Sequence, residues 1–363
     1  MTAVLAQETS PYVQLGSTYA RELGVRGIPA SVLAHKWKLA DLLAPHSDLD
    51  LRILLADPPQ NWWEWNHLLA AAHTAIVSRN VANRRMLEHP PGFAFTLSEV
   101  EQRHVAPAEL ATWSLISGHP RTFHRWKSQA QMAPWSGVDE LFYRGILNAR
   151  IGGRYRLSDD SADNVHVDLA GYHRHCVLWH YLAPCWFAIA SLATRTRCPG
   201  KFAALAQWHP PDLEHHGQAF VHRARDRHDQ PIAELLRDTH AAVAAAMRYL
   251  PAPAENEASP PTVTMAAGML RVRVARWLYY LDPPPGTATA YLIRREAREL
   301  QGAAAALRGF ASDQATRHQR LVARMADLLP TGATTRRVLS DTLTSWRRHR
   351  TLVEDFFNAG DPS

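Results

Sequence analysis

The chain has 363 residues, of which 46% are apolar and 20% charged, and its formal net charge is +6. Such a chain is long enough to bury a sizeable core, and its composition excludes wholesale disorder. The basic residues form no stripe of the kind that nucleic-acid binding requires, and no apolar window approaches the roughly 18 residues of a membrane span.

Three cysteines, Cys176, Cys185 and Cys198, are too few and too poorly paired to predict a disulfide framework. They favour a reducing compartment. The first ten residues lack the basic start and apolar run of a signal peptide. We therefore expect a cytoplasmic protein with neither a membrane nor a nucleic acid as partner.

Helical periodicity dominates the chain, and strand signals are sparse. Prolines and glycines separate the predicted helices of the first half. These helices are predicted at residues 28–43, 62–77, 97–103, 108–117, 121–132 and 138–147. Thr96 is the predicted N-cap of the third of them. The segment 62–77 is apolar almost all round, which predicts that it is buried.

The second half continues the same pattern. Helices are predicted at residues 171–194, 212–225, 231–249, 264–281, 288–308, 313–328 and 338–357. The fold class predicted from these elements is all-α, a helical bundle. Residues 1–60 are expected to form an N-terminal helical segment and residues 61–363 the main helical domain, unless the two are continuous.

Twenty histidines raise the question of a metal site. His215 and His222 lie seven residues apart and share a helix face, but nearby arginines such as Arg223 favour a polar surface there. A metal-binding surface at this helix is kept as a remote alternative. The Glu101-x-x-His104 turn has no second copy in the sequence, so a di-iron bundle is not predicted.

His318 stands out for its surroundings. Leu321, Val322 and Met325 follow it at helical spacing and share its face. A neutral imidazole on an apolar face can ligate a metal, and its neighbours suit a flat macrocycle. The loop 330–335 that follows contains small and hydroxylated residues, which fit either a ligand contact or an ordinary helix connector.

The run Arg-His-x-x-x-Val-x-Arg-Met around His318, followed by a Thr-Gly loop and a helix, resembles the tryptophan 2,3-dioxygenase and indoleamine 2,3-dioxygenase superfamily. The segment 23–37, with its Leu-Gly, Pro and Val-Leu-Ala-x-x-Trp, and the segments 142–153 and 171–178 are also similar to members of that superfamily. The resemblance implies a helical fold that holds haem between helices, with His318 as the proximal iron ligand.

The resemblance also implies a distal helix that starts at Trp62. Trp62 and Trp63 would then contact the substrate, and Asn66 or His67 would act on bound oxygen. On the substrate side, the resemblance implies contacts from two arginines and from the loop after the His318 helix. The substrate-binding residues expected there are Arg154, Arg156, Thr331, Gly332 and Thr334. Val322 occupies the position of a cysteine that attaches haem covalently in one relative, so non-covalent haem b is expected.

The function implied by this resemblance is that of a haem-dependent oxygenase in a specialised biosynthetic pathway. It would use O2 or peroxide to oxidise an aromatic amino acid or an indole-type molecule, as a dioxygenase on tryptophan or as a monooxygenase on tyrosine. The altered Thr-Gly loop leaves an alternative open, a haem-binding or sensor protein without turnover. The oligomeric state is open as well, and a homo-oligomer is compatible with the sequence.

Overall fold

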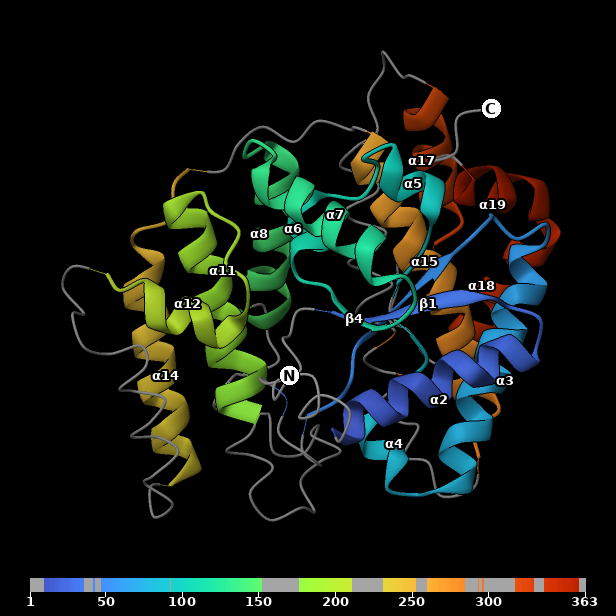
Figure 1. Cartoon of the computed structure of the whole chain (residues 1–363), viewed down its shortest axis with the longest axis horizontal. Helices are drawn as coiled ribbons and strands as arrows, with labels where there is room; N and C mark the ends of the chain where they lie inside the picture. The colour runs from blue at the N-terminus through green and yellow to red at the C-terminus, as the bar shows by residue number, and fades with distance from the viewer. Residues whose placement is uncertain are drawn as a thin grey trace.

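The computed structural model describes most of the chain, and the statements below concern the residues it describes. These are residues 10–35, 42, 47–91, 93–151, 176–210, 231–252, 260–284, 293, 296, 317–329 and 336–358. This part of the chain is mainly helical, as the sequence predicts, but it also contains a four-stranded sheet (Figure 1). The sheet corrects the expectation of an all-α protein.

The sheet has the order β3-β2-β1-β4. Its strands are β1 (Ala30–Ala34), β2 (Leu51–Leu55), β3 (Phe93–Thr96) and β4 (Ser114–Ser117). Strand β1 is antiparallel to both β2 and β4, whereas β2 and β3 are parallel. The helix predicted at residues 28–43 is therefore wrong where β1 lies, and so is the end of the one predicted at 108–117. Because β2 is buried along its whole length, its apolar run lacks the alternation that marks a half-exposed strand.

One face of the sheet packs on helices from both ends of the chain. They are α2 (Pro11–Val25), α3 (Trp62–Arg79) and α15 (Pro260–Leu281). The side chain of Asn61 caps α3 by accepting hydrogen bonds from the backbone N–H groups of Trp63 and Glu64. Three C-terminal helices complete this core. They are α17 (Arg317–Asp327), α18 (Arg336–Arg348) and α19 (Arg350–Phe357).

Gly268 allows α15 to lie directly against β3. A Cβ atom at this position would come within 3.0 Å of Phe95 Cε1 and 3.1 Å of the carbonyl oxygen of Ala94. Arg271, one turn further along α15, donates a hydrogen bond to the same carbonyl oxygen at 3.1 Å. The helix and the strand are thus joined where they come closest.

The other face of the sheet packs on shorter helices. They are α5 (Leu97–Glu101), α6 (Pro107–Ala111) and α7 (Pro120–Met132). The predicted N-cap at Thr96 is confirmed. Its hydroxyl accepts from the N–H of Glu99, and the Glu99 carboxylate accepts from the N–H of Thr96. The four-residue helix α4 (Asn83–Met86) follows α3 and precedes β3.

A second group of helices, which we call the helical layer, has its own apolar core. It lies to the left of the sheet in Figure 1. Its members are α8 (Gly137–Ile151), the π-helix η2 (Cys176–Leu182), α11 (Ala183–Thr194), α12 (Lys201–Gln207) and α14 (Ile232–Met247). Pro184 cannot donate to the carbonyl of His180 four residues earlier, and its ring crowds that carbonyl. The wider π-helical turn accommodates this clash.

Two boundaries differ from the sequence prediction. The expected helical segment at residues 1–60 contains α2 but also β1 and β2, which form one sheet with strands beyond residue 60. The helix predicted at 338–357 is divided at His349 into α18 and α19. No helix within the described ranges is long and apolar enough to cross a membrane.

Candidate metal centre

Two aspartates and a histidine meet where β2 and β3 begin. Asp48 and Asp50 directly precede β2, and their spacing of two places both side chains on one side of the strand. The parallel register pairs Arg52 with Phe93. Before this ladder the backbone N–H of Leu49 donates to the carbonyl oxygen of Met86 at 2.7 Å, which holds the segment with His89 beside the two aspartates. Strand β1 ends beside them, and the backbone N–H of His35 donates to the carbonyl oxygen of Asp50 at 2.9 Å.

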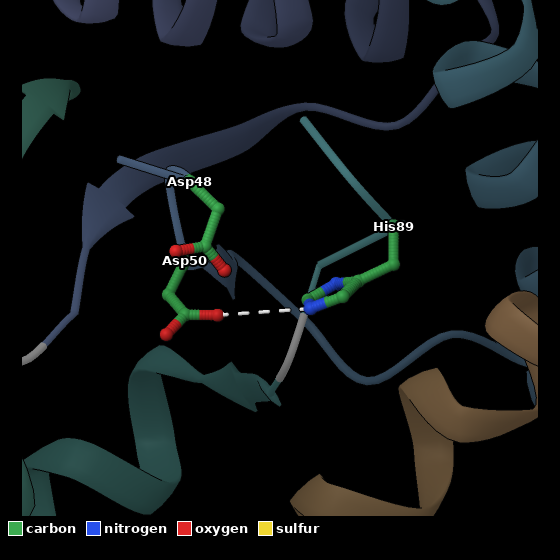
Figure 2. A group of neighbouring side chains, drawn as sticks. All are labelled: Asp48, Asp50 and His89. Carbon is green, nitrogen blue, oxygen red and sulfur yellow. Dashed lines mark ion pairs between the residues drawn. The ribbon is translucent and has the colours of Figure 1, made fainter. Parts of the chain in front are cut away.

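The three side chains turn toward one another (Figure 2). One ligand atom from each of Asp48, Asp50 and His89 lies within 4.8 Å of the other two. The His89 side chain is 5% exposed, whereas that of Asp50 is 22% exposed. The imidazole is therefore enclosed by protein, while the carboxylate of Asp50 is partly accessible to solvent.

The hydrogen bonds of His89 define its tautomer. Its Nδ1 lies 2.9 Å from the carbonyl oxygen of Pro90, which can only accept, so Nδ1 carries the proton. In the neutral ring, Nε2 then presents a lone pair toward Asp50 Oδ1 at 3.9 Å. This distance is too long for a hydrogen bond between the two atoms. It is below the largest separation that two ligands of one cation can have when each is bonded at about 2.0–2.2 Å.

A further histidine approaches Asp48 from the helical layer. His180 of η2 places Nε2 4.0 Å from Asp48 Oδ1, and its side chain is 14% exposed. The next residue, Tyr181, shares a 2.6 Å hydrogen bond with His240 of α14. The start of β2 is therefore flanked by one imidazole from the sheet and one from the helical layer.

A buried ion pair between Arg52 and Glu109 lies next to this end of the sheet. Arg52, two residues after Asp50, donates from Nε to Glu109 Oε1 at 2.7 Å. The same oxygen lies 3.1 Å from Nδ1 of His35 and accepts from Nε1 of Trp113 at 2.9 Å. Burial opposes the charge of Glu109, but Arg52 and then His35 hold the pKa of its carboxyl well below the usual range. This group fixes His35 and thereby the backbone of Asp50.

The residues predicted on the distal helix lie on α3, away from this centre. Trp62 is buried, with the Arg271 guanidinium 4.3 Å from its ring centroid and its indole N–H bonded to Asn358. Asn66 is buried and donates from its amide to the carbonyl oxygen of Trp62 at 2.6 Å. Trp63 is half-buried beneath Arg347, and His67 is exposed. The four side chains therefore do not converge.

The remaining predicted residues lie outside the part of the chain that the structure describes in full. Arg154, Arg156 and the loop with Thr331, Gly332 and Thr334 lie outside the described residues. His318 is the second residue of α17, and its side chain is likewise outside the description.

The apolar face predicted for the His318 helix is confirmed at the positions that the structure describes. Leu321, Val322 and Met325 of α17 are all buried. Their burial places this side of the helix against the core that covers the first face of the sheet.

Sequence reasoning missed Asp48, Asp50, His89 and His180. The available signal was an Asp-x-Asp pair immediately before an apolar run, but pairing it with a histidine about forty residues later requires the strand register. Comparison of the chain with protein-family models, with curated proteins and with solved structures found no match.

Proposed function

We propose that Asp48, Asp50 and His89 bind a divalent cation and that the protein uses it to transfer a phosphate-containing group. The observation that carries the proposal is the position of His89. Its Nδ1 is bonded to the Pro90 carbonyl, and its Nε2 lies 3.9 Å from Asp50 Oδ1. Histidine ligands in metal sites characteristically donate their other ring N–H to a carbonyl or carboxylate.

Charge supports the same assignment. Two carboxylates close together repel each other, and a bound cation removes that repulsion. Ionised carboxylates are hard oxygen donors that suit Mg²⁺ and Mn²⁺. Three protein ligands leave coordination positions open, and in sites with one or two carboxylates such positions are typically filled by water and substrate phosphate. A cation at this centre would therefore bind an anionic substrate through its phosphate oxygens.

The chemistry that follows is displacement at phosphorus. Asp48, Asp50 and His89 would hold the cation, which would supply Lewis-acid stabilisation of charge on a bound phosphate. In the transfer a bond would form between an acceptor oxygen and phosphorus, a phosphoanhydride bond of the substrate would break, and the acceptor proton would leave to solvent. The leaving phosphate takes the electron pair of the broken bond.

Titration with Mn²⁺, followed by electron paramagnetic resonance of the free ion, tests the cation site. Wild-type protein is expected to bind Mn²⁺, and Asp50→Asn to bind it at least 10-fold more weakly. Asp57→Asn is the matched control, because Asp57 is an exposed aspartate just beyond the same strand. Equal affinity of the wild type and Asp50→Asn would contradict the proposal.

Phosphorus NMR of a nucleoside triphosphate with Mg²⁺ or Mn²⁺ and a panel of hydroxyl acceptors tests the transfer. The expected result is release of phosphate or pyrophosphate that depends on the cation and is lost in Asp48→Asn. Cation binding without turnover of any acceptor in the panel would contradict the proposed transfer and leave only a cation-binding protein.

The haem-dependent oxygenase, acting on an aromatic amino acid or indole, stays a second proposal. The buried apolar face of α17 favours it. The described α3 residues do not fit a haem face, because Arg271 and Phe357 cover the Trp62 ring and Asn66 is bonded within its own helix.

Reconstitution with haem b and measurement of the Soret band test this second proposal. It predicts a Soret band that is lost in His318→Ala and kept in His349→Ala, which changes an exposed histidine at the boundary between α18 and α19. If a band forms, titration with tryptophan, tyrosine and indole distinguishes an enzyme from a sensor. The absence of a Soret band after reconstitution would contradict the proposal of a haem-dependent oxygenase.

A further inference from the structure

Helix α18 presents a row of arginines to solvent. It contains Arg336, Arg337, Arg347 and Arg348 against one acidic residue, Asp341, and all five are exposed. Four arginines minus one aspartate give this 13-residue helix a formal net charge of +3, which is half of the +6 of the whole chain. We propose that this face of α18 binds the phosphate backbone of a single-stranded nucleic acid.

The helical repeat brings the four arginines together. Arg347 follows Arg336, and Arg348 follows Arg337, by eleven residues, which is close to three full turns of an α-helix. The members of each pair therefore lie along one line of the helix, about 16 Å apart at roughly 1.5 Å per residue. In the sequence they form two separate pairs, so no basic stripe is visible there. The opposite side of α18 packs in the core through Leu339, Leu343 and Trp346.

The space between the two pairs suits a run of phosphates. A length of about 16 Å corresponds to about five phosphates of a strand at roughly 3.4 Å each. Ser340 is exposed on the same side of the helix, one turn after Arg336. Arginine and serine side chains are among those that contact phosphate oxygens in nucleic-acid complexes. Asp341 lies 3.7 Å from Arg337, but the two side chains are 70% and 90% exposed, so their pair is weak and a phosphate can replace it.

An aromatic ring adjoins the C-terminal end of this face. The Arg347 guanidinium lies 5.4 Å from the ring centroid of Trp63, which is half-buried at the start of α3. Arg350 is exposed in the first turn of α19 and adds a positive charge nearby. Unpaired bases stack on aromatic rings and on guanidinium planes. Phosphate contacts beside a stacking surface favour a single strand over a duplex, whose bases are enclosed.

An anionic membrane fits the face less well. A helix that lies on a membrane inserts apolar side chains into it. Every residue of α18 is described, and its exposed positions hold only arginine, serine, threonine and aspartate, whereas its leucines and its tryptophan are in the core. Charge therefore has to carry most of the interaction, which predicts a steep dependence on salt.

Fluorescence anisotropy of a labelled oligouridylate with the full chain tests the proposal. EDTA is included so that the result does not depend on the proposed cation site. Wild-type protein is expected to bind, with an affinity that falls as salt rises. The double variant Arg337→Gln/Arg348→Gln is expected to bind about 10-fold more weakly. Its salt slope should be smaller by about 1.4, because each phosphate contact on a single strand contributes about 0.7.

The matched control is Arg121→Gln/Arg125→Gln, which removes the same charge from exposed positions of α7 and should bind like the wild type. Circular dichroism of each variant shows that it is folded. Equal affinities of the two double variants would overturn the proposal, as would a wild-type protein that does not bind oligouridylate at low salt. Tighter binding of a duplex than of the single strand would contradict the choice of ligand. Binding to phosphatidylserine vesicles without binding to oligouridylate would assign the face to a membrane instead.

Discussion

Arg276 and His89 donate to the same carbonyl oxygen, that of Pro90. His89 Nδ1 lies 2.9 Å and Arg276 Nε 3.2 Å from it. Arg276 belongs to α15, so a helix near the end of the chain holds the residue that orients the imidazole. Its guanidinium also approaches Glu296 at 3.5 Å. The ligand geometry at the start of β3 therefore depends on side chains almost two hundred residues away.

Replacement of Arg276 should weaken metal binding although the residue is not a ligand. Arg276→Gln is expected to lower Mn²⁺ affinity about 10-fold, because the loss of a supporting hydrogen bond misorients the imidazole. Arg273→Gln is the matched control. Arg273 also pairs with Glu296, at 2.7 Å, and is also buried. Equal Mn²⁺ affinities of the two variants, measured by electron paramagnetic resonance, would show that the Pro90 contact is irrelevant.

The Arg52–Glu109 pair should be important for stability. Both side chains are buried, so Glu109→Gln leaves the Arg52 charge uncompensated and is expected to cost about 3–5 kcal/mol of unfolding free energy. Glu101→Gln removes an exposed pair with Arg125 and should cost less than about 1 kcal/mol. Urea unfolding measures both. Similar losses in the two variants would contradict the burial argument.

His73 should make the protein sensitive to acid. Its Nε2 lies 3.0 Å from the Leu87 carbonyl oxygen, and burial lowers the pKa of its ring from 6.5 to about 3. Between pH 6.5 and about 3, the His73 ring therefore binds a proton in the unfolded chain but stays neutral in the folded chain. The stability contributed by neutral His73 is complete above pH 6.5 and is lost as the pH falls toward 3.

The matching experiment compares unfolding free energies at pH 7.5 and pH 5. His73→Gln, which keeps a donor for Leu87, should lose about 2 kcal/mol less on acidification than the wild type. His349→Gln, at an exposed position, should follow the wild type. If His73→Gln retains the full dependence on pH, another group is responsible.

Trp62 and Trp63 should differ sharply when truncated. Trp62 is enclosed by Arg271, Trp65 and Phe357, so Trp62→Ala is expected to cost about 3–5 kcal/mol. Trp63 is only half-buried, so Trp63→Ala should cost about 1 kcal/mol. Thermal unfolding of both variants checks this. A small effect at Trp62 would indicate that its surroundings are less tightly packed than described.

The sequence predicted those elements whose signals are local. Helix α3 begins at Trp62 as expected, because its apolar run is long and Asn61 caps it. The N-cap at Thr96 was also predicted from local sequence, and the structure adds the reciprocal hydrogen bond of Glu99 that makes it a capping box. Strand β1 was mistaken for a helix, because a short apolar run covered on both sides carries neither period.

The metal centre could not be predicted in the same way. Asp48 and Asp50 form a visible pair, but His89 joins them only because the segments that precede β2 and β3 lie side by side in the fold. His180, which approaches Asp48, comes from a different layer. Such contacts arise from tertiary packing, and no window of the sequence contains them. The partners of Trp62 on α3 likewise lie near the C-terminus and could not be read from the local pattern.

The absence of a side chain at Gly268 sets the spacing between α15 and β3. An added methyl group would meet the Phe95 ring and the Ala94 carbonyl at about 3 Å, so helix and strand would have to separate by a few tenths of an ångström. The same helix supplies Arg276 to the loop that carries His89. Gly268 thus sets how closely α15 approaches the sheet, and with it the position of Arg276 beside the His89 loop. A residue that contacts none of the proposed metal ligands can therefore affect where they lie.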